Sequence, residues 1–304
     1  DIAEDSISSY QKQDSISAME VVPIVTGPSN LCSMMFSWTL LVSVWLCALA
    51  GPLFVAIALL TNSWDLLLNI GCLWLLSCMV KFPYISAFSE YVSCGLKSWF
   101  NLFSIQYTLM PIDSSRPTIY CYHPHGVLSI GMVLLAADLI RRGEPVAIVT
   151  SSHMRWFNPV LKILLDIAGI EIVGSSPSEV QAAMREGKKS LILVPGGYEE
   201  GVLTREGFER VFLRNRLGFV KYAMRHGYSL TPVYAYGEND LYTCVPFADS
   251  VREFFASWKV PLMLFYGEPG IPFMPKRTPE GMRIIVGNPL VVPRISNPNN
   301  ATLH

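Results

Sequence analysis

Two histidines flank a proline in the segment Tyr122-His123-Pro124-His125-Gly126. Imidazole is the side chain best suited to act as a base near neutral pH. Pro124 fixes its own φ and pushes His123 toward an extended conformation, while Gly126 lets the backbone turn sharply or approach a ligand. The segment joins a short apolar strand to a helical pattern, which is where α/β proteins place chemistry. It predicts a catalytic base; a pair of hydrogen-bonded turn histidines is the alternative.

Two further loops, residues 196–200 and 237–240, also follow predicted strands and carry glycine and carboxylate residues. Because the carboxyl ends of parallel strands meet at one edge of a sheet, we expect these loops to join the histidine loop in one cleft. A histidine base, a carboxylate and exposed glycine N–H groups are the equipment of acyl transfer. The three loops together favour that reading over three independent structural turns.

Other chemistries find less support in the sequence. Residues 126–131 resemble a G-x-S-x-G serine elbow but are one residue too long. His123 and His125 have no further His or Cys cluster near them, and the seven cysteines form no C-x-x-C pair, so we expect neither a metal site nor a cofactor. A basic run predicts either a solvated helix face or a cradle for phosphates of a nucleotide-like donor or of lipid headgroups: Arg205, Arg210, Arg214, Arg216, Lys221 and Arg225.

The elements that must position these loops alternate between strand and helix from Pro117 onward. This alternation predicts an α/β fold, with a mostly parallel sheet and helices on both faces. Strands are expected at 118–122, 145–150, 170–173, 190–194 and 230–236, with helices at 127–142, 158–168, 178–186 and 207–225. Residues 262–265 and 283–286 resemble closing strands.

The N-terminal part of the chain indicates a membrane. Only 15% of all residues are charged, against about 25% in soluble domains, and residues 21–64 contain no charge at all. Residues 31–50 are long enough to span a bilayer, Gly51-Pro52 is expected to break the helix, and residues 66–80 form a second apolar stretch. The two apolar stretches fit either a membrane hairpin or a single span with an interfacial helix. Basic residues lie on both flanks of this region and favour a hairpin with both ends in the cytosol.

These patterns divide the chain into a polar tail at 1–30, a transmembrane or re-entrant hairpin at 31–81, an interfacial linker at 82–116 and a catalytic domain at 117–304. The 23 basic and 24 acidic residues nearly cancel, which gives no sign of a nucleic-acid partner.

Four ordered blocks resemble the type-two diacylglycerol acyltransferase family, which includes monoacylglycerol and wax-alcohol acyltransferases. They match its H-P-H-G, G-G-x-x-E, R-x-R-x-G-F-V-[RK] and G-E-N-D motifs at residues 123–126, 196–200, 214–221 and 237–240. Residues 286–289 resemble its terminal V-G-x-P segment. The resemblance covers roughly Pro117 to Val292 and implies a glycerolipid-acyltransferase-like fold.

The resemblance implies an enzyme that moves an acyl group from acyl-CoA to diacylglycerol, giving triacylglycerol. It implies the endoplasmic reticulum membrane, a cytosol-facing catalytic domain, a route to lipid droplets, and a membrane protein that could form homo-oligomers. The acceptor could instead be monoacylglycerol or a long-chain alcohol. A membrane lipid hydrolase using the same cleft and a non-catalytic lipid-binding protein are the alternatives from other classes.

Site residues follow from the matched blocks. His125 is the expected general base because plant relatives read E-P-H-S and keep only the second histidine. His123 is an orienting neighbour, and Glu200 is the expected partner of the His125 imidazole, with Glu238 or Asp240 as runner-up. Backbone N–H groups of Gly126, Gly196 or Gly197 are expected to receive the oxyanion. Substrate-binding candidates are Arg214, Arg216, Lys221, Glu238, Asn239 and Asp240.

Overall fold

The computed structural model describes residues 19–20, 31–100, 104–108, 116–151, 158–213, 216–245, 250–252, 254, 264–271, 273–277, 281–296 and 298. The predicted polar tail lies outside these ranges except for Met19–Glu20. Arg214, a predicted substrate-binding residue, also lies outside them.

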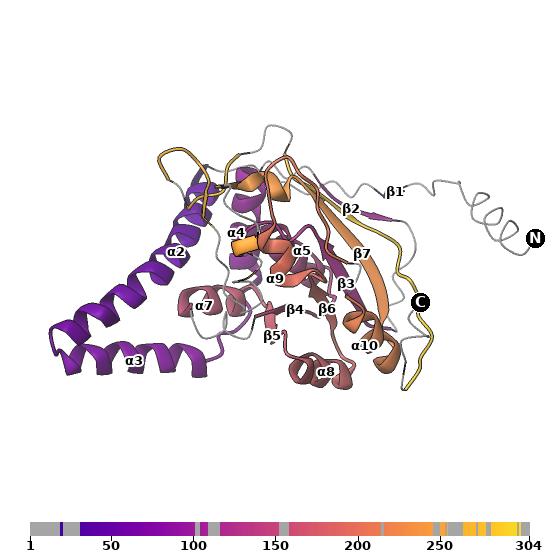
Figure 1. Cartoon of the computed structure of the whole chain (residues 1–304), viewed down its shortest axis with the longest axis horizontal. Helices are drawn as coiled ribbons and strands as arrows, with labels where there is room; N and C mark the ends of the chain where they lie inside the picture. The colour runs from indigo at the N-terminus through magenta and orange to yellow at the C-terminus, as the bar shows by residue number, and fades with distance from the viewer. Residues whose placement is uncertain are drawn as a thin grey trace, which may run out of the picture.

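An eight-stranded, mostly parallel sheet forms the centre of the molecule (Figure 1). Its strands are β1 (Met19–Glu20), β2 (Ser104–Thr108), β3 (Thr118–His123), β4 (Val146–Thr150), β5 (Glu171–Gly174), β6 (Ser190–Leu193), β7 (Ser229–Tyr236) and β10 (Arg283–Val286). They lie in the order β1-β2-β10-β7-β3-β6-β4-β5. The pairs from β7 to β5 are all parallel, whereas β10 runs antiparallel to β7, and β1 antiparallel to β2. The predicted α/β class and its mostly parallel sheet are therefore confirmed.

Alternate residues of each strand face opposite sides of the sheet, so each face builds its own core. Tyr120 and Tyr122 pack in the cluster that includes helix α5 (Ile130–Arg141) and Leu165 of helix α7 (Pro159–Ile167). Ile119 and Cys121 pack on the other face with helices α8 (Pro177–Glu186) and α10 (Gly218–His226). Helices on both faces were predicted, and the two clusters confirm them.

The region between the apolar stretches and the sheet combines a helix with a strand that the sequence did not predict. Helix α4 (Ser86–Trp99) contacts α5, and β2 follows it and pairs in parallel with β10. Ile105 and Tyr107 of β2 are buried. This segment was expected to be a linker helix throughout, because its aromatic residues do not separate an interfacial helix from a buried strand.

Two connections differ from the predicted elements for local reasons. Helix α5 begins at Ile130 and not at Val127, because Gly126 and Ser129 have left-handed φ values of 60° and 50°. The long basic helix predicted at residues 207–225 is wrong: helix α10 begins only at Gly218. Gly207 turns at a φ of 72°, which a helix cannot accommodate, and residues 209–213 are irregular.

Helices α2 (Leu31–Leu60) and α3 (Trp64–Met79) are joined by a short turn at which Asn62 has a φ of 53°. Pro52 lies inside α2, so the break expected at Gly51-Pro52 is wrong; an apolar helix can tolerate the missing hydrogen bond of one proline. Among the described residues, α2 is the one helix long and apolar enough to cross a membrane.

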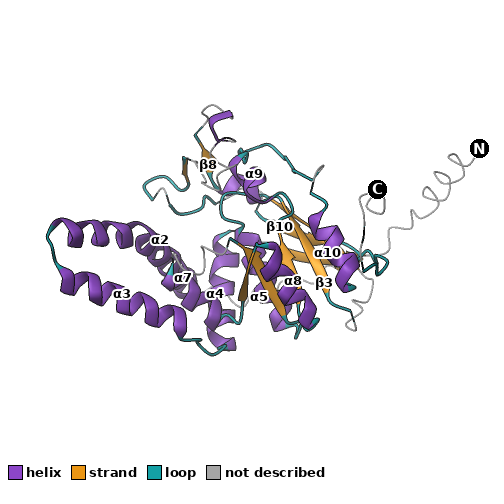
Figure 2. Cartoon of the chain, turned by 60° about the horizontal axis from the view of Figure 1, so that its bottom comes forward, coloured by secondary structure: helices purple, strands orange, loops and turns teal. Residues whose placement is uncertain are grey.

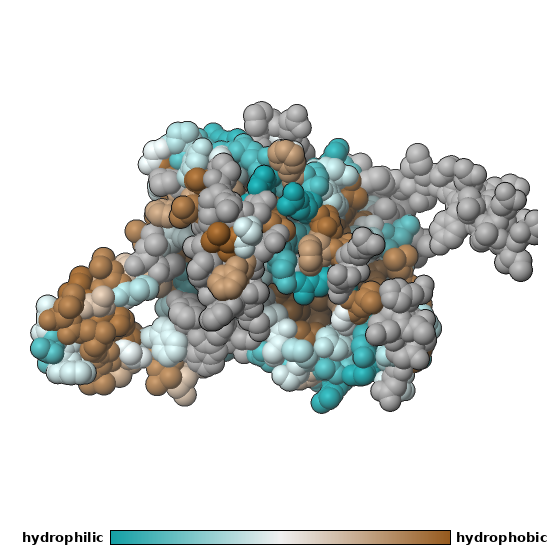
Figure 3. Space-filling view, in the orientation of Figure 1, coloured by the Kyte–Doolittle hydropathy of each residue, from teal (hydrophilic) through white to brown (hydrophobic). Residues whose placement is uncertain are grey.

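The pair α2 and α3 projects from the α/β domain, with α7 lying on the side of the domain that faces it (Figures 1 and 2). Its far end is hydrophobic, whereas hydrophilic residues spread over much of the visible face of the domain (Figure 3). Leu60, Trp64 and Leu73 are 84%, 69% and 69% exposed. An apolar surface of this extent is typical of a site that contacts a membrane or another protein.

Candidate active site

Strand β3 lies between β6 and β7, so the loops that follow these three strands meet at one edge of the sheet. The histidine loop follows the central strand. Helix α9 (Gly197–Val202), which carries Glu200, follows β6, and the short 3₁₀ helix η2 (Glu238–Leu241) follows β7. The predicted convergence of the three loops is confirmed.

His125 is oriented by the backbone of its own loop. Its Nδ1 lies 2.8 Å from the carbonyl oxygen of Gly126, so Nδ1–H is the donor and Nε2 is left unprotonated in the neutral ring. The ring lies against Gly201, where an added Cβ would come within 2.9 Å of Nδ1. The residue as a whole is half-buried, and its ring is desolvated. A histidine held in this tautomer can accept a proton at Nε2.

Glu200 contacts both histidines, but not in the way the sequence suggested. Its Oε1 lies 3.2 Å from Nδ1 of His123 and accepts the backbone N–H of His125 at 2.8 Å. Its Oε2 accepts the N–H of Phe212 at 3.1 Å. Glu200 was expected to hold the His125 imidazole; it holds the His123 imidazole and the His125 backbone, because the Gly126 carbonyl already occupies Nδ1 of His125.

The two glycines of the G-G-x-x-E block make room for the Glu200 side chain and shape the turn. A Cβ added to Gly196 would lie 2.2 Å from Oε2 of Glu200, so a side chain at this position would displace the carboxylate. Gly197 has a φ of 57°, and its N–H donates to the carbonyl of Val194 at 3.1 Å. Because that N–H is already used, Gly197 is a weaker oxyanion donor than the sequence suggested.

Glu238 caps the helix that follows the histidines. Its Oε1 accepts the N–H of Ile130 at 2.8 Å, and its Oε2 accepts the N–H of Gly131 at 2.9 Å and the hydroxyl of Tyr122 at 2.7 Å. A carboxylate at a helix N-terminus is favoured by the helix dipole. Gly126 lies against it, since a Cβ there would come within 2.7 Å of the Glu238 Cγ. Glu238 therefore positions the histidine loop.

Burial shifts the pKa values of His125 and Glu238 in opposite directions. Burial lowers the pKa of His125 below its ordinary value, although the Gly126 carbonyl and the Glu200 charge raise it in part. Burial raises the pKa of Glu238 to about 7, against the opposing effect of its hydrogen bonds from Tyr122, Gly131 and Ile130. His125 is thus neutral at physiological pH, which is the form that accepts a proton.

The other predicted binding residues divide into two groups. Asn239 donates to the carbonyl of Phe208 at 2.9 Å, and Asp240 accepts the N–H of Gly207 at 2.9 Å, so both hold the loop after α9. Arg216 forms an ion pair with Glu199 and lies 5.4 Å from the centre of the Phe212 ring. Lys221 lies on α10, and no contact among the described residues connects it to the histidine loop.

Sequence reasoning did not identify the contacts of three side chains of this site, although Ser129 was considered as part of a serine elbow. Ser129 donates to the His125 carbonyl at 2.7 Å, so its hydroxyl is engaged with backbone and is not poised as a nucleophile. Thr204 bonds the carbonyls of Gly126 and Glu200, each at 3.2 Å. Tyr122 bonds Glu238. Thr204 follows Glu200 by four residues, a spacing that could have suggested its bond to the Glu200 carbonyl.

Comparison with known proteins shows which family the chain resembles. The family model described as "Diacylglycerol acyltransferase" matches residues 56–304. The chain is 32% identical over 212 residues to diacylglycerol O-acyltransferase 1 of Schizosaccharomyces pombe, covering 64% of this chain and 59% of that protein. It is 31% identical over 205 residues to diacylglycerol O-acyltransferase 2 of Dictyostelium discoideum, covering 63% and 62%.

The human protein named diacylglycerol O-acyltransferase 2 is 28% identical over 204 residues, covering 61% of this chain and 51% of its own length. The chain thus spans less than two thirds of the length of these curated relatives. No solved structure gives a significant match to this chain.

Proposed function

The chain belongs to the diacylglycerol acyltransferase family, and from this premise we propose that it transfers an acyl group from acyl-CoA to the free hydroxyl of diacylglycerol. The product is triacylglycerol. The observation that carries the proposal is the bond between Nδ1 of His125 and the Gly126 carbonyl, which leaves Nε2 unprotonated, as a base at the sheet edge must be.

The transfer is direct, with His125 as general base. Nε2 takes the proton of the acceptor hydroxyl as that oxygen attacks the thioester carbonyl. The new C–O bond forms, the C–S bond breaks, and CoA leaves as a thiolate. The proton on His125 then passes to the thiolate or to water, which restores the neutral ring. Holding both substrates in one orientation supplies a further part of the rate.

Glu200 and His123 support His125 from one side. The Glu200 carboxylate fixes the backbone N–H of His125 and lies 3.2 Å from the His123 ring. Its negative charge also favours the imidazolium form that His125 adopts during transfer, since opposite charges attract strongly in a buried site. Both residues are positioning residues in this account.

The oxyanion of the tetrahedral intermediate is received by the histidine loop. Gly126 presents its backbone without a side chain at a φ of 60°. Among the described residues, no hydrogen-bond acceptor is found for its N–H. A preorganised N–H donor at such a position is worth about 10²–10³ in rate in other acyl-transfer enzymes.

Among the basic residues described near the site, we assign Arg216 to bind the phosphates of CoA. Its ion pair with Glu199 places a guanidinium one residue away from Glu200 along α9. Guanidinium groups bind phosphates through two parallel hydrogen bonds. Arg214 and Lys221 complete this assignment by their place in the same sequence block.

We place the enzyme in the endoplasmic reticulum membrane, with its catalytic domain facing the cytosol and its product entering lipid droplets. Helix α2 is about 45 Å long at 1.5 Å per residue, which exceeds the roughly 30 Å of a bilayer core. The shorter helix α3 returns from the turn toward the domain, which supports the proposal that the pair acts as a hairpin anchoring the domain. Association into homo-oligomers is compatible with this arrangement.

The experiment measures acyl transfer in membranes that contain the chain. Labelled oleoyl-CoA is offered with diacylglycerol, monoacylglycerol or a fatty alcohol in parallel reactions. Labelled triacylglycerol as the main product supports the proposal, and preference for another acceptor reassigns the chain within its family. Release of free oleate without an acceptor indicates a hydrolase. No product from any acceptor, with folded protein present in the membrane, overturns the enzymatic proposal.

A further inference from the structure

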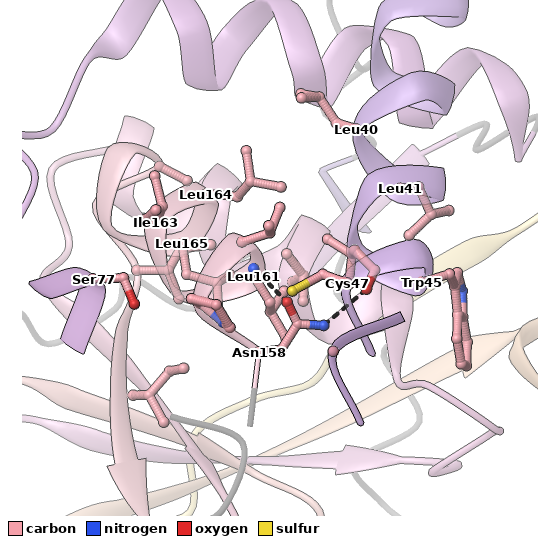
Figure 4. Close-up of a pocket in the computed structure, with 18 of the residues that line it drawn as sticks. Leu40, Leu41, Trp45, Cys47, Ser77, Asn158, Leu161, Ile163, Leu164 and Leu165 are labelled. Atoms are coloured by element: carbon pink, nitrogen blue, oxygen red, sulfur yellow. Dashed lines mark hydrogen bonds between the residues drawn. The ribbon is translucent and has the colours of Figure 1, made fainter. Parts of the chain in front are cut away.

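A large apolar cavity lies between the projecting helices and the α/β domain (Figure 4). Its volume is about 1540 Å³, larger than the roughly 300–1,000 Å³ of pockets for drug-sized molecules. Its walls come from α2, α3 and α4 on one side and from α5, α7, β4 and β5 on the other. The cavity is therefore formed jointly by the helix pair and the catalytic domain.

The lining of the cavity carries no charged side chain among the described residues. The Asn158 side chain in this lining is already satisfied: Oδ1 accepts the N–H of Leu161 at 3.0 Å, and Nδ2 donates to the carbonyl of Val44 at 2.9 Å (Figure 4). A phosphate or nucleotide would find no compensating charge here, and burying it would be costly. Hydrocarbon chains without charge are the ligand that this lining suits.

Helix α7 holds both walls of the cavity. Asn158 at its N-terminus bonds α2 through the Val44 carbonyl. Lys162 and Asp166 bind the end of α3, since Lys162 donates to the Val80 carbonyl at 2.5 Å and the N–H of Phe82 donates to Asp166 at 3.2 Å. Two separate anchors on one helix fix α2 and α3 against the domain, so the space between them is a built feature.

The cavity reaches the histidine loop. Leu128 and Ile130 are among its lining residues, three and five positions after His125. Ile130 is also held by Glu238, and Ser129 between them bonds the His125 backbone. A chain lying in the cavity would therefore end beside the loop that carries the base.

We propose that this cavity receives the hydrocarbon chains of the neutral lipid acceptor, which enters from the bilayer between α2 and α3 and brings its hydroxyl to His125. The inference rests on the proposed function, in which that hydroxyl is the acceptor of the acyl group. The acyl donor approaches from the polar side, because its nucleotide part is charged and belongs near Arg216. The uncharged acceptor is the substrate that can cross an apolar passage from the membrane.

Gly71 offers a way to fill the cavity without disturbing the protein. It lines the cavity in the middle of α3, and a Cβ added there meets nothing within 4 Å. Gly71→Phe places a ring in this open space. Leu76→Phe is the matched control, because Leu76 lies on the same helix, is 59% exposed and is not part of the lining.

Gly71→Phe is expected to raise the KM for dioleoylglycerol about tenfold, while transfer to dibutyrylglycerol stays within about twofold of wild type; tenfold corresponds to about 1.4 kcal/mol. Leu76→Phe is expected to behave as wild type with both acceptors. A change that follows the chain length of the acyl-CoA, with acceptor preference unchanged, assigns the cavity to the donor and overturns the proposal. Equal loss with both acceptors also overturns it.

A binding measurement separates this inference from the proposed reaction. A diacylglycerol with a photoreactive group at the end of one chain is irradiated with the full-length protein in vesicles, and labelled peptides are identified. Labelling of α2, α3 and α7 that dioleoylglycerol competes away and Gly71→Phe reduces supports the cavity even if no acyl transfer is found. Labelling that is unchanged in Gly71→Phe overturns it even if transfer is active.

Discussion

The Glu200 carboxylate contacts the imidazole of His123 and the backbone N–H of His125, with Oε1 lying 3.2 Å from Nδ1 of His123. One carboxylate oxygen thus links the two histidines, while the imidazole of His125 is oriented separately by the Gly126 carbonyl. This division fits different roles for the two histidines of one motif: in the proposed mechanism His125 faces the reaction, whereas His123 connects the loop to α9.

Removing Glu200 should affect rate through position. Glu200→Ala leaves the N–H groups of His125 and Phe212 without an acceptor and frees the His123 ring, so we expect kcat to fall roughly 10- to 100-fold, with the KM for acyl-CoA little changed. His123→Ala should cost less than His125→Ala. The double variant His123→Ala/Glu200→Ala should cost less than the two single losses combined, because the residues act as one unit. Additive losses in steady-state kinetics would argue against that coupling.

Gly126 should not tolerate a side chain. Gly126→Ala places a Cβ within 2.7 Å of the Glu238 Cγ at a φ of 60°, so we expect a loss of at least about 2 kcal/mol in stability together with loss of activity. Gly143→Ala is the control, since Gly143 also has a positive φ, 84°, but open space around it. It should lose only about 1 kcal/mol, the cost of the backbone conformation alone. Thermal unfolding in detergent measures both, and equal shifts would remove the packing argument.

The buried carboxyl of Glu238 should make stability depend on pH in a defined direction. With its pKa raised to about 7 in the folded state, its protonated form is favoured by folding. The stability linked to this proton is present below the unfolded pKa near 4.5 and is lost as pH rises through about 7. The Tm of wild type relative to Glu238→Gln should therefore fall between pH 5 and pH 8. A difference in Tm that rises with pH would show that the carboxylate form is the stable one.

The pH profile of acyl transfer should report the lowered pKa of His125. Because burial keeps the ring neutral below pH 6.5, the base form persists into mildly acidic solution, and kcat should fall only below that pH. Glu238 also titrates close to the histidine loop. The acid limb should therefore remain in Glu238→Gln, which removes the group that changes charge near pH 7. An inflexion above pH 6.5 in both proteins would contradict the assignment.

The sequence predicted the sheet and the meeting of its three loops, because buried parallel strands are nearly continuous apolar runs that end in glycine-rich turns. It could not predict the partner of each side chain. Whether Glu200 binds the ring or the backbone of His125 depends on a carbonyl, that of Gly126, which the sequence does not distinguish from any other. The strand β2 was missed for a related reason: its burial comes from pairing with β10, far along the chain.

The predicted helix at residues 207–225 shows the opposite error. Its basic residues fit a helical period, but two side chains from other elements capture its backbone: Asp240 accepts the N–H of Gly207, and Glu200 accepts that of Phe212. Local pattern was outweighed by tertiary hydrogen bonds. The same bonds bring this loop to the site, so the failure of the local pattern marks a functional region.

His125 is the proposed base, and a comparison of two histidine variants tests this role. His125→Ala and His226→Ala are assayed side by side for labelled triacylglycerol from oleoyl-CoA and diacylglycerol, with membrane content and Tm matched to wild type. His226 is the control because it lies at the end of α10, away from the histidine loop. We predict a loss of about 10²–10⁴ in kcat for His125→Ala and less than about twofold for His226→Ala. Transfer that persists at the wild-type rate in folded His125→Ala would contradict the account.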